Sequence, residues 1–221
     1  MEYNLYQNPL ISRYASAEMA KIFSDDTKIK LWRKLWIVLA ESQKELGINI
    51  TDGQIAELKR YQNDINWEIA QEREKIVRHD VMAHVYAYGE QAKSAKSIIH
   101  LGATSCYVTD NAEIIMIYNA LEVVKKKLIT LIDLLSKFAL KYKDLVTLGF
   151  THFQAAQPTT VGKRATLWIQ DLMLDFENLE FLINNIKLRG VKGTTGTQAS
   201  FLKLFKGNSQ KVIELEKLIL S

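Results

Sequence analysis

Residues 111–143 read NAEIIMIYNALEVVKKKLITLIDLLSKFALKYK and contain neither glycine nor proline. Apolar side chains recur along this stretch at steps of three and four, at Ile114, Ile117, Leu121, Val124, Leu128, Leu131, Leu135 and Phe138. This spacing places them on one face of a helix that would be about 50 Å long at ~1.5 Å per residue. The lysines at 125–127 exclude a helix that crosses a bilayer. So long an apolar face needs partner helices, which predicts a bundle of long helices.

Downstream, the pattern predicts a second long helix over residues 159–188. Pro158 would stand at its entrance, where a missing N–H group is harmless. The glycine- and threonine-rich segment 190–200 is expected to be a loop. A further amphipathic helix starts near Asn208 and reaches Ser221 with no glycine or proline to end it. We therefore expect a truncated chain that stops within the bundle.

Upstream, the same periodicity predicts shorter helices over residues 27–46, from Thr51 onward, over residues 66–77 and over residues 81–92. Gly47 follows the first of these helices as a left-handed C-terminal cap. Thr51 and Gln54 match a capping box at the start of the second. The small residues of segment 98–105 mark a break between two regions.

The expected fold class is therefore all-α. An N-terminal helical domain would span residues 1–104, and residues 105–221 would form the first long helices of an incomplete central helical bundle. The scarcity of turn-forming residues agrees with an all-α fold, because two prolines and ten glycines are too few for a fold rich in β-turns.

Composition limits the possible partners and compartments. The net charge of +4 is the balance of 29 basic and 25 acidic residues, so no nucleic-acid partner is expected. A single cysteine, Cys106, excludes an internal disulfide framework. The sequence shows no secretory signal and no apolar run of about 18 residues. We expect a cytoplasmic protein with no membrane partner.

Four polar clusters interrupt the helical pattern: Ser12-Arg13-Tyr14, Arg78-His79-Asp80, Gly102-Ala103-Thr104-Ser105 and Thr151-His152-Phe153-Gln154. Each lies near an expected helix end, where free backbone N–H groups can bind anions. Each also has a purely structural explanation: Asp80 could cap a helix, and His152 could be a hydrogen-bonded histidine of the core. No metal site is expected, because His79 and His84 are five residues apart and do not share a helix face.

Four blocks resemble the adenylosuccinate lyases, a family of the fumarase/aspartase superfamily. They read RHDVMAH (78–84), HLGATSCYV (100–108), LGFTHFQAAQ (148–157) and RGVKGTTGTQAS (189–200). The blocks occur in the family's order over nearly the whole chain. A joint match of this kind is far more specific than any one block.

The resemblance implies a reaction, the β-elimination of fumarate from adenylosuccinate, giving AMP, and from the succinylcarboxamide ribotide SAICAR, giving AICAR. It implies neither a metal nor an organic cofactor. His152 would be the general acid that protonates the departing nitrogen, since histidine can hold or release a proton near neutrality. His79 would be a second active-site histidine, flanked by Arg78 and Asp80 in the nucleotide-binding stretch.

The resemblance assigns substrate binding to seven residues: Arg13, Tyr14, Arg78, Asp80, Thr104, Ser105 and Thr151. Arg13 and Tyr14 match the pair that grips the nucleotide phosphate, for which an arginine fork is well shaped. Thr104 and Ser105 match the pair that binds the carboxylates of the succinyl group, and Thr151 would assist.

The sequence departs from the family at the catalytic base, a serine in a loop reading Ser-Ser-x-Met-Pro-x-Lys-x-Asn-Pro, which is missing here. The resemblance also implies a homotetramer whose sites combine several subunits, so we expect this chain alone to be inactive. Two alternatives stay open. One is another fumarate-releasing lyase of the superfamily, such as argininosuccinate lyase or a cycloisomerase. The other is a non-catalytic helical assembly module.

Overall fold

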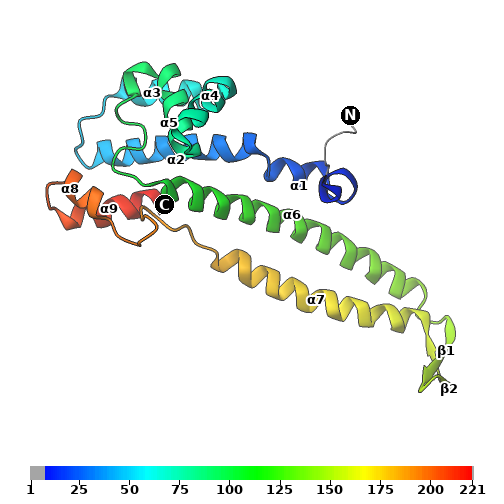
Figure 1. Cartoon of the computed structure of the whole chain (residues 1–221). Helices are drawn as coiled ribbons and strands as arrows, with labels where there is room; N and C mark the ends of the chain where they lie inside the picture. The colour runs from blue at the N-terminus through cyan, green and yellow to red at the C-terminus, as the bar shows by residue number, and fades with distance from the viewer. Residues whose placement is uncertain (1–7, 221) are drawn as a thin grey trace. The chain divides into compact units, whose positions relative to one another are not determined.

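The computed structural model describes residues 8–220 and is built almost entirely of helices (Figure 1), which confirms the all-α fold class. Its contacts divide the chain into two compact units. One comprises the residues up to Met116 together with those from Lys187 onward, and the other comprises Ile117–Ile186. These units do not coincide with the expected domain boundary after residue 104, which stays a prediction.

The first unit collects most of the helical elements: η1 (Leu10–Tyr14, a π-helical turn), α1 (Ala17–Ile22), α2 (Asp25–Glu45), α3 (Asp52–Tyr61), α4 (Trp67–Val77), α5 (Asp80–Gln91), η2 (Lys93–Ala95, a 3-10 turn), the start of α6 (Ser105–Lys141), α8 (Ala199–Leu204) and α9 (Ser209–Leu220). The sequence predicted α2 to α5, α6 and α9, and missed the short elements η1, α1, η2 and α8. The predicted capping box of Thr51 and Gln54 is present. Gly47 adopts the predicted left-handed conformation, with φ +92°.

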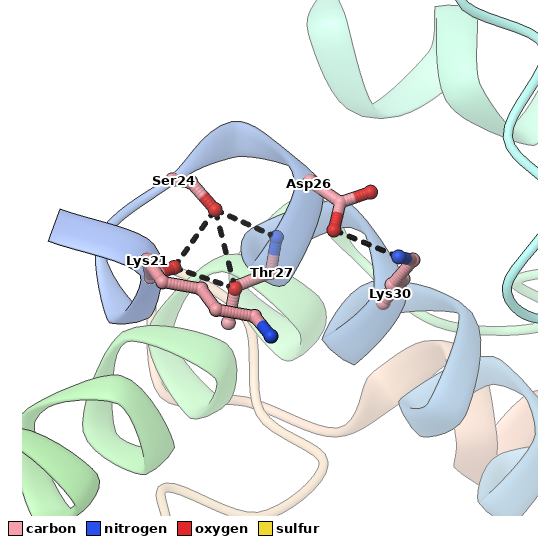
Figure 2. Close-up of polar contacts among 5 residues, drawn as sticks. All are labelled: Lys21, Ser24, Asp26, Thr27 and Lys30. Carbon is pink, nitrogen blue, oxygen red and sulfur yellow. Dashed lines mark hydrogen bonds and ion pairs between the residues drawn. The ribbon is translucent and has the colours of Figure 1, made fainter. Parts of the chain in front are cut away.

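Side chains of Ser24 and Thr27 fix the junction between α1 and α2, as Figure 2 shows. Ser24 Oγ accepts from the Thr27 N–H at 3.2 Å and donates to the Lys21 carbonyl at 2.8 Å. Thr27 Oγ1 donates to the same carbonyl at 2.7 Å. One turn further along α2, Lys30 pairs with Asp26 at 2.7 Å. The end of one helix is therefore bonded directly to the start of the next, as a side-chain N-cap allows.

The core of the first unit is centred on α2. Trp32 and Trp36 of α2 are 2% and 0% exposed, and they pack with Tyr88 of α5 and Tyr107 of α6, which are both fully buried. Both hydroxyl groups are bonded, because Tyr88 donates to the Leu58 carbonyl at 2.7 Å and Tyr107 to a carbonyl of α2 at 2.8 Å. The core therefore leaves neither phenol unpaired.

A buried arginine holds α5 against α2. Arg33 is fully buried, and its guanidinium donates to the carbonyls of Tyr61 and Asp64 and to Gln91 Oε1 at 2.8 Å. The same group stacks over the Tyr88 ring at 4.2 Å. Burial lowers the pKa of Arg33 to about 10, so the group stays charged at neutral pH. This anchor fixes α5, whose N-terminus carries His79.

The second unit contains the rest of α6, a hairpin of β1 (Val146–Thr151) and β2 (Gln154–Thr160), and α7 (Val161–Asn185). The predicted long helices are confirmed, but the hairpin was not predicted. Pro158 lies in β2 rather than in the first turn of α7, so its predicted position was wrong. A two-stranded sheet tolerates proline because each strand has one side without partners. Thr160 caps α7 by accepting from the Lys163 N–H at 3.1 Å.

Candidate active site

The second polar cluster lies where α4 ends and α5 begins. Arg78 ends α4 in the left-handed conformation, with φ +49°, and its N–H donates to the Glu74 carbonyl at 2.7 Å. His79 holds the N-cap position of α5, although its contact with the Met82 N–H is long, at 3.5 Å. Asp80 accepts from the N–H of the next residue at 2.7 Å. The tight turn therefore leaves the side chains of Arg78, His79 and Asp80 exposed to solvent.

His79 meets the third cluster at the N-terminus of α6. Its Nε2 lies 3.0 Å from Ser105 Oγ, although the two residues are 26 positions apart. On its other side, His79 Nδ1 lies 3.5 Å from Asp80 Oδ1. Asp80, His79 and Ser105 thus form a continuous polar chain from the start of one helix to the start of another.

The loop after α7 is pinned to α6 by a buried asparagine. Asn111 is fully buried, and its Oδ1 accepts from the Arg189 N–H at 2.8 Å. Its Nδ2 donates to the carbonyls of Gly190 at 3.0 Å and Tyr107 at 2.6 Å. Sequence reasoning missed this residue, since a single polar side chain near the start of an apolar stripe gives no signal of its own.

The same loop lies against the first turn of α6. Thr194 Oγ1 is 2.9 Å from Cys106 Sγ. A Cβ atom on Gly193 would lie 2.7 Å from Thr104 Oγ1, so glycine is required for this close approach. Three of the four resembling blocks, at 78–84, 100–108 and 189–200, therefore meet around one helix N-terminus.

His100 is partly buried and interacts electrostatically with His79 of this cluster, and sequence reasoning did not assign it to the site. Its Nδ1 accepts from Trp36 Nε1 at 2.9 Å, so the neutral ring carries its proton on Nε2. Burial, followed by repulsion from His79, lowers the pKa of His100 to about 4. Its backbone has φ +62°, a conformation uncommon outside glycine. The only sequence signal was its place within the HLGATSCYV block.

The cluster has the chemistry of an anion site. The N-terminus of a long helix carries a partial positive charge and unpaired N–H groups. Thr104 and Ser105 add hydroxyl donors there, and Arg78 lies beside His79 in the chain. Within residues 8–220 there is no group of three or more histidine, cysteine or acidic side chains placed to hold a metal ion.

The first cluster stands apart from these contacts. Arg13 and Tyr14 lie in η1 and are exposed, Tyr14 by 75%. Neither side chain forms a hydrogen bond or an ion pair with any residue in the described range 8–220. The structure therefore does not join them to the His79 cluster through any contact.

The fourth cluster belongs to the second unit, where His152 and Phe153 form the tip of the hairpin. Thr151 pairs with Gln154, which leaves a two-residue turn with φ +50° at His152 and +59° at Phe153. Positive φ at both positions is the type I′ geometry that matches the twist of a hairpin. His152 is exposed, so the alternative of a core histidine is wrong for this chain.

Comparison with known proteins identifies the relatives of this chain. The adenylosuccinate lyases of Schizosaccharomyces pombe and Saccharomyces cerevisiae are each 54% identical to it over 99% of its length, and that of Schistosoma mansoni is 52% identical. The chain spans 46% of the length of each of these relatives.

Solved structures share the fold. A fumarate lyase from Mesorhizobium sp. BNC1 superimposes with a TM-score of 0.81 at 22% identity, over 97% of this chain and 48% of that one. A 3-carboxy-cis,cis-muconate lactonizing enzyme from Pseudomonas putida superimposes with a TM-score of 0.79 at 22% identity, over 97% of this chain and 50% of that one. A family model described as lyase matches residues 38–208, which is most of the chain. The chain therefore belongs to the lyase family of the fumarase/aspartase superfamily.

Proposed function

We propose that a protein containing this chain acts as an adenylosuccinate lyase, releasing fumarate from adenylosuccinate to give AMP and from SAICAR to give AICAR. The observation that carries the proposal is the 52–54% identity, over 99% of the chain, to three relatives that bear this name. The contact of His79 with Ser105 at the N-terminus of α6 supports it, because it assembles donors for an anionic substrate.

The proposed reaction moves two protons. A base removes a proton from the succinyl carbon beside a carboxylate, the C–N bond breaks with its electron pair going to nitrogen, and an acid protonates that nitrogen. His152 is the proposed acid, and its exposure at a tight turn leaves the imidazole free to reach a substrate. Proton transfer from a positioned group is typically worth ~10²–10⁴-fold in rate.

The remaining roles follow the same proposal. Thr104 and Ser105, on the helix terminus, bind the succinyl carboxylates together with His79. Arg78 and Asp80 contact the nucleotide. Arg13 and Tyr14 bind its phosphate, and Thr151 assists beside His152. No cofactor takes part.

The base and the complete site come from outside these 221 residues. The proposal therefore includes a homotetramer whose sites are shared between subunits. It also includes a cytoplasmic location and a division of this chain into two domains, residues 1–104 and 105–221. Exposed apolar side chains on the second unit support assembly, among them Leu140 at 70% and Phe181 at 67% exposure. Within residues 8–220, none of the helices is both long and apolar enough to pass through a membrane.

A chimera tests the activity. The chain replaces the matching part of the S. pombe relative, and fumarate release is measured with adenylosuccinate, SAICAR and argininosuccinate. We expect turnover of the first two only, and a 10²–10⁴-fold loss of kcat in His152→Ala. The unfused 221-residue chain should release no fumarate.

The control is Asp144→Asn, which removes an exposed charge at the base of the same hairpin. Equal losses of kcat in His152→Ala and Asp144→Asn would show that His152 takes no part in the reaction. Preference for argininosuccinate would favour the other fumarate-releasing lyases. A folded chimera with no turnover of any substrate would favour the assembly module.

A further inference from the structure

The loop of residues 189–200 is held at both ends against α6 and the turn that precedes it. At the start of the loop, the fully buried Asn111 of α6 accepts from the Arg189 N–H at 2.8 Å. At its end, Ser200 Oγ donates to the Gly102 carbonyl at 2.6 Å. A displacement of the whole loop would therefore break hydrogen bonds at both ends, one of them to a buried amide that would be left unpaired.

Two further contacts hold the middle of the loop. Lys192 forms an ion pair with Glu216 of α9. Thr194 Oγ1 lies 2.9 Å from Cys106 Sγ, in the first turn of α6. Because these contacts stand directly before and after Gly193, the backbone of this glycine has little freedom to move away from α6.

Gly193 faces the side chain of Thr104. A Cβ atom added at Gly193 would lie 2.7 Å from Thr104 Oγ1, 3.1 Å from its Cγ2 and 3.4 Å from its Cβ, and these are the three atoms nearest to it. The first two distances are too short for van der Waals contact. Thr104 is exposed, so its side chain can turn about χ1 until the hydrogen on Cβ faces the added methyl group. The methyl group would therefore displace the Thr104 hydroxyl and leave the backbone where it is.

We propose that Gly193 is a positioning residue of the candidate active site, and that the space left by its missing side chain fixes where the Thr104 hydroxyl stands. The inference rests on the proposed function, in which Thr104 and Ser105 bind the carboxylates of the succinyl group. A hydroxyl donates well to a carboxylate only over a narrow range of distance and angle, so its position decides the strength of the bond. Gly193 acts through Thr104 and touches no substrate itself.

Steady-state kinetics of Gly193→Ala in the chimera with the S. pombe relative test the inference. The KM for adenylosuccinate should rise about 10- to 100-fold, the range for loss of a hydrogen bond to a charged group. The kcat should change by no more than about twofold, because Thr104 binds the substrate and its transition state alike. Gly53→Ala makes the same chemical change where a Cβ would meet only Thr51 Oγ1, at 3.9 Å, and should leave both constants unchanged.

Thr104→Ala shows whether the effect of Gly193→Ala passes through Thr104. The variant keeps only the Cβ of residue 104, at an ordinary contact distance of 3.4 Å from the added methyl group. Adding Gly193→Ala to Thr104→Ala should therefore raise the KM by no more than about twofold. Full additivity of the two losses, an unchanged KM in Gly193→Ala, or a fall in kcat alone would each overturn the inference.

A measurement on the 221-residue chain separates this inference from the proposed function. The three-bond couplings of a threonine methyl carbon report χ1, and the Thr104 signal is identified by its loss in Thr104→Ala. Gly193→Ala should change χ1 of Thr104, and Gly53→Ala should not. An unchanged χ1 would overturn the inference even in an active chimera. A chimera without turnover would instead contradict the proposed function, and a changed χ1 would still support the control of Thr104 by Gly193.

Discussion

His84 and His100 are held as neutral imidazoles, because burial lowers the pKa of each to about 4. In the unfolded chain both would titrate near 6.5. Between pH 6.5 and 4 the unfolded state therefore binds more protons than the folded state, and stability must fall as the pH falls. The carboxylates whose pKa is lowered, Glu57 and Glu90, lose their contribution only below about pH 4.5.

We predict that the free energy of unfolding is nearly constant between about pH 7 and 9 and drops on acidification towards pH 4. The loss should be about 1–3 kcal/mol for each of the two histidines. Urea titrations followed by circular dichroism at several pH values measure it.

His84→Gln is the matched test of this residue-scale argument. The variant removes one titrating group, so its stability should depend less steeply on pH between 6.5 and 4 even if its stability at pH 7 is lower. An unchanged slope would show that His84 is not buried in its neutral form.

Single residues also explain which parts of the site the sequence could predict. His79, Ser105 and His152 stood out because they belong to blocks that resemble a family. The contact between His79 and Ser105 could not be predicted, because it depends on how α5 and α6 pack. The sequence around Asn111 gave no sign of its role, because its hydrogen-bond partners in the loop, Arg189 and Gly190, are 78 and 79 positions away.

At the scale of elements, helices were predictable where their ends carry local signals. The capping box of Thr51 and Gln54 is satisfied within four residues, and the sequence displays it directly. The hairpin lacked such a signal, because its turn is His152-Phe153 instead of the asparagine–glycine pair typical of type I′ turns. From sequence alone, Pro158 fits a helix start, the commoner position for proline near a helix, as well as the strand that it occupies.

The close approach of α7 to the end of α6 gives a prediction at this scale. Gly162, at the start of α7, is buried, and its N–H donates to the Tyr142 carbonyl at 2.9 Å. A Cβ atom there would lie 2.8 Å from Lys143 N, which is backbone and cannot rotate away. Gly162→Ala should lower the free energy of unfolding by about 1–3 kcal/mol, as overpacking does, measured by urea denaturation.

Gly53→Ala provides the control, since it makes the same chemical change in another helix. A Cβ on Gly53 would meet only Thr51 Oγ1, at 3.9 Å. Replacing glycine by alanine in a helix without a clash is neutral or stabilising by up to ~1 kcal/mol. If both variants behaved alike, the close packing of Gly162 would be wrong.

At the scale of the whole molecule, the two units differ in how far they bury their apolar side chains. The first unit has a core around Trp36 and Tyr88 that is closed to solvent. The second unit leaves large apolar side chains exposed on α6, α7 and the hairpin: Leu134, Leu140, Phe150, Trp168 and Phe181 are each more than half exposed. Monomeric proteins rarely expose apolar surface on this scale, so the second unit needs a covering partner.

We predict that the 221-residue chain self-associates at micromolar concentration through its second unit. Sedimentation velocity should show a weight-average coefficient that rises with concentration, because association removes the exposed apolar area from water. Leu140→Lys combined with Phe181→Lys should suppress the rise. Ile76→Lys, which alters an apolar side chain of the first unit that is 74% exposed, should not. If the unaltered chain stayed monomeric up to about 100 µM, the exposed surface of α6 and α7 would not drive assembly, and the proposal of a shared, multi-subunit site would lose its structural support.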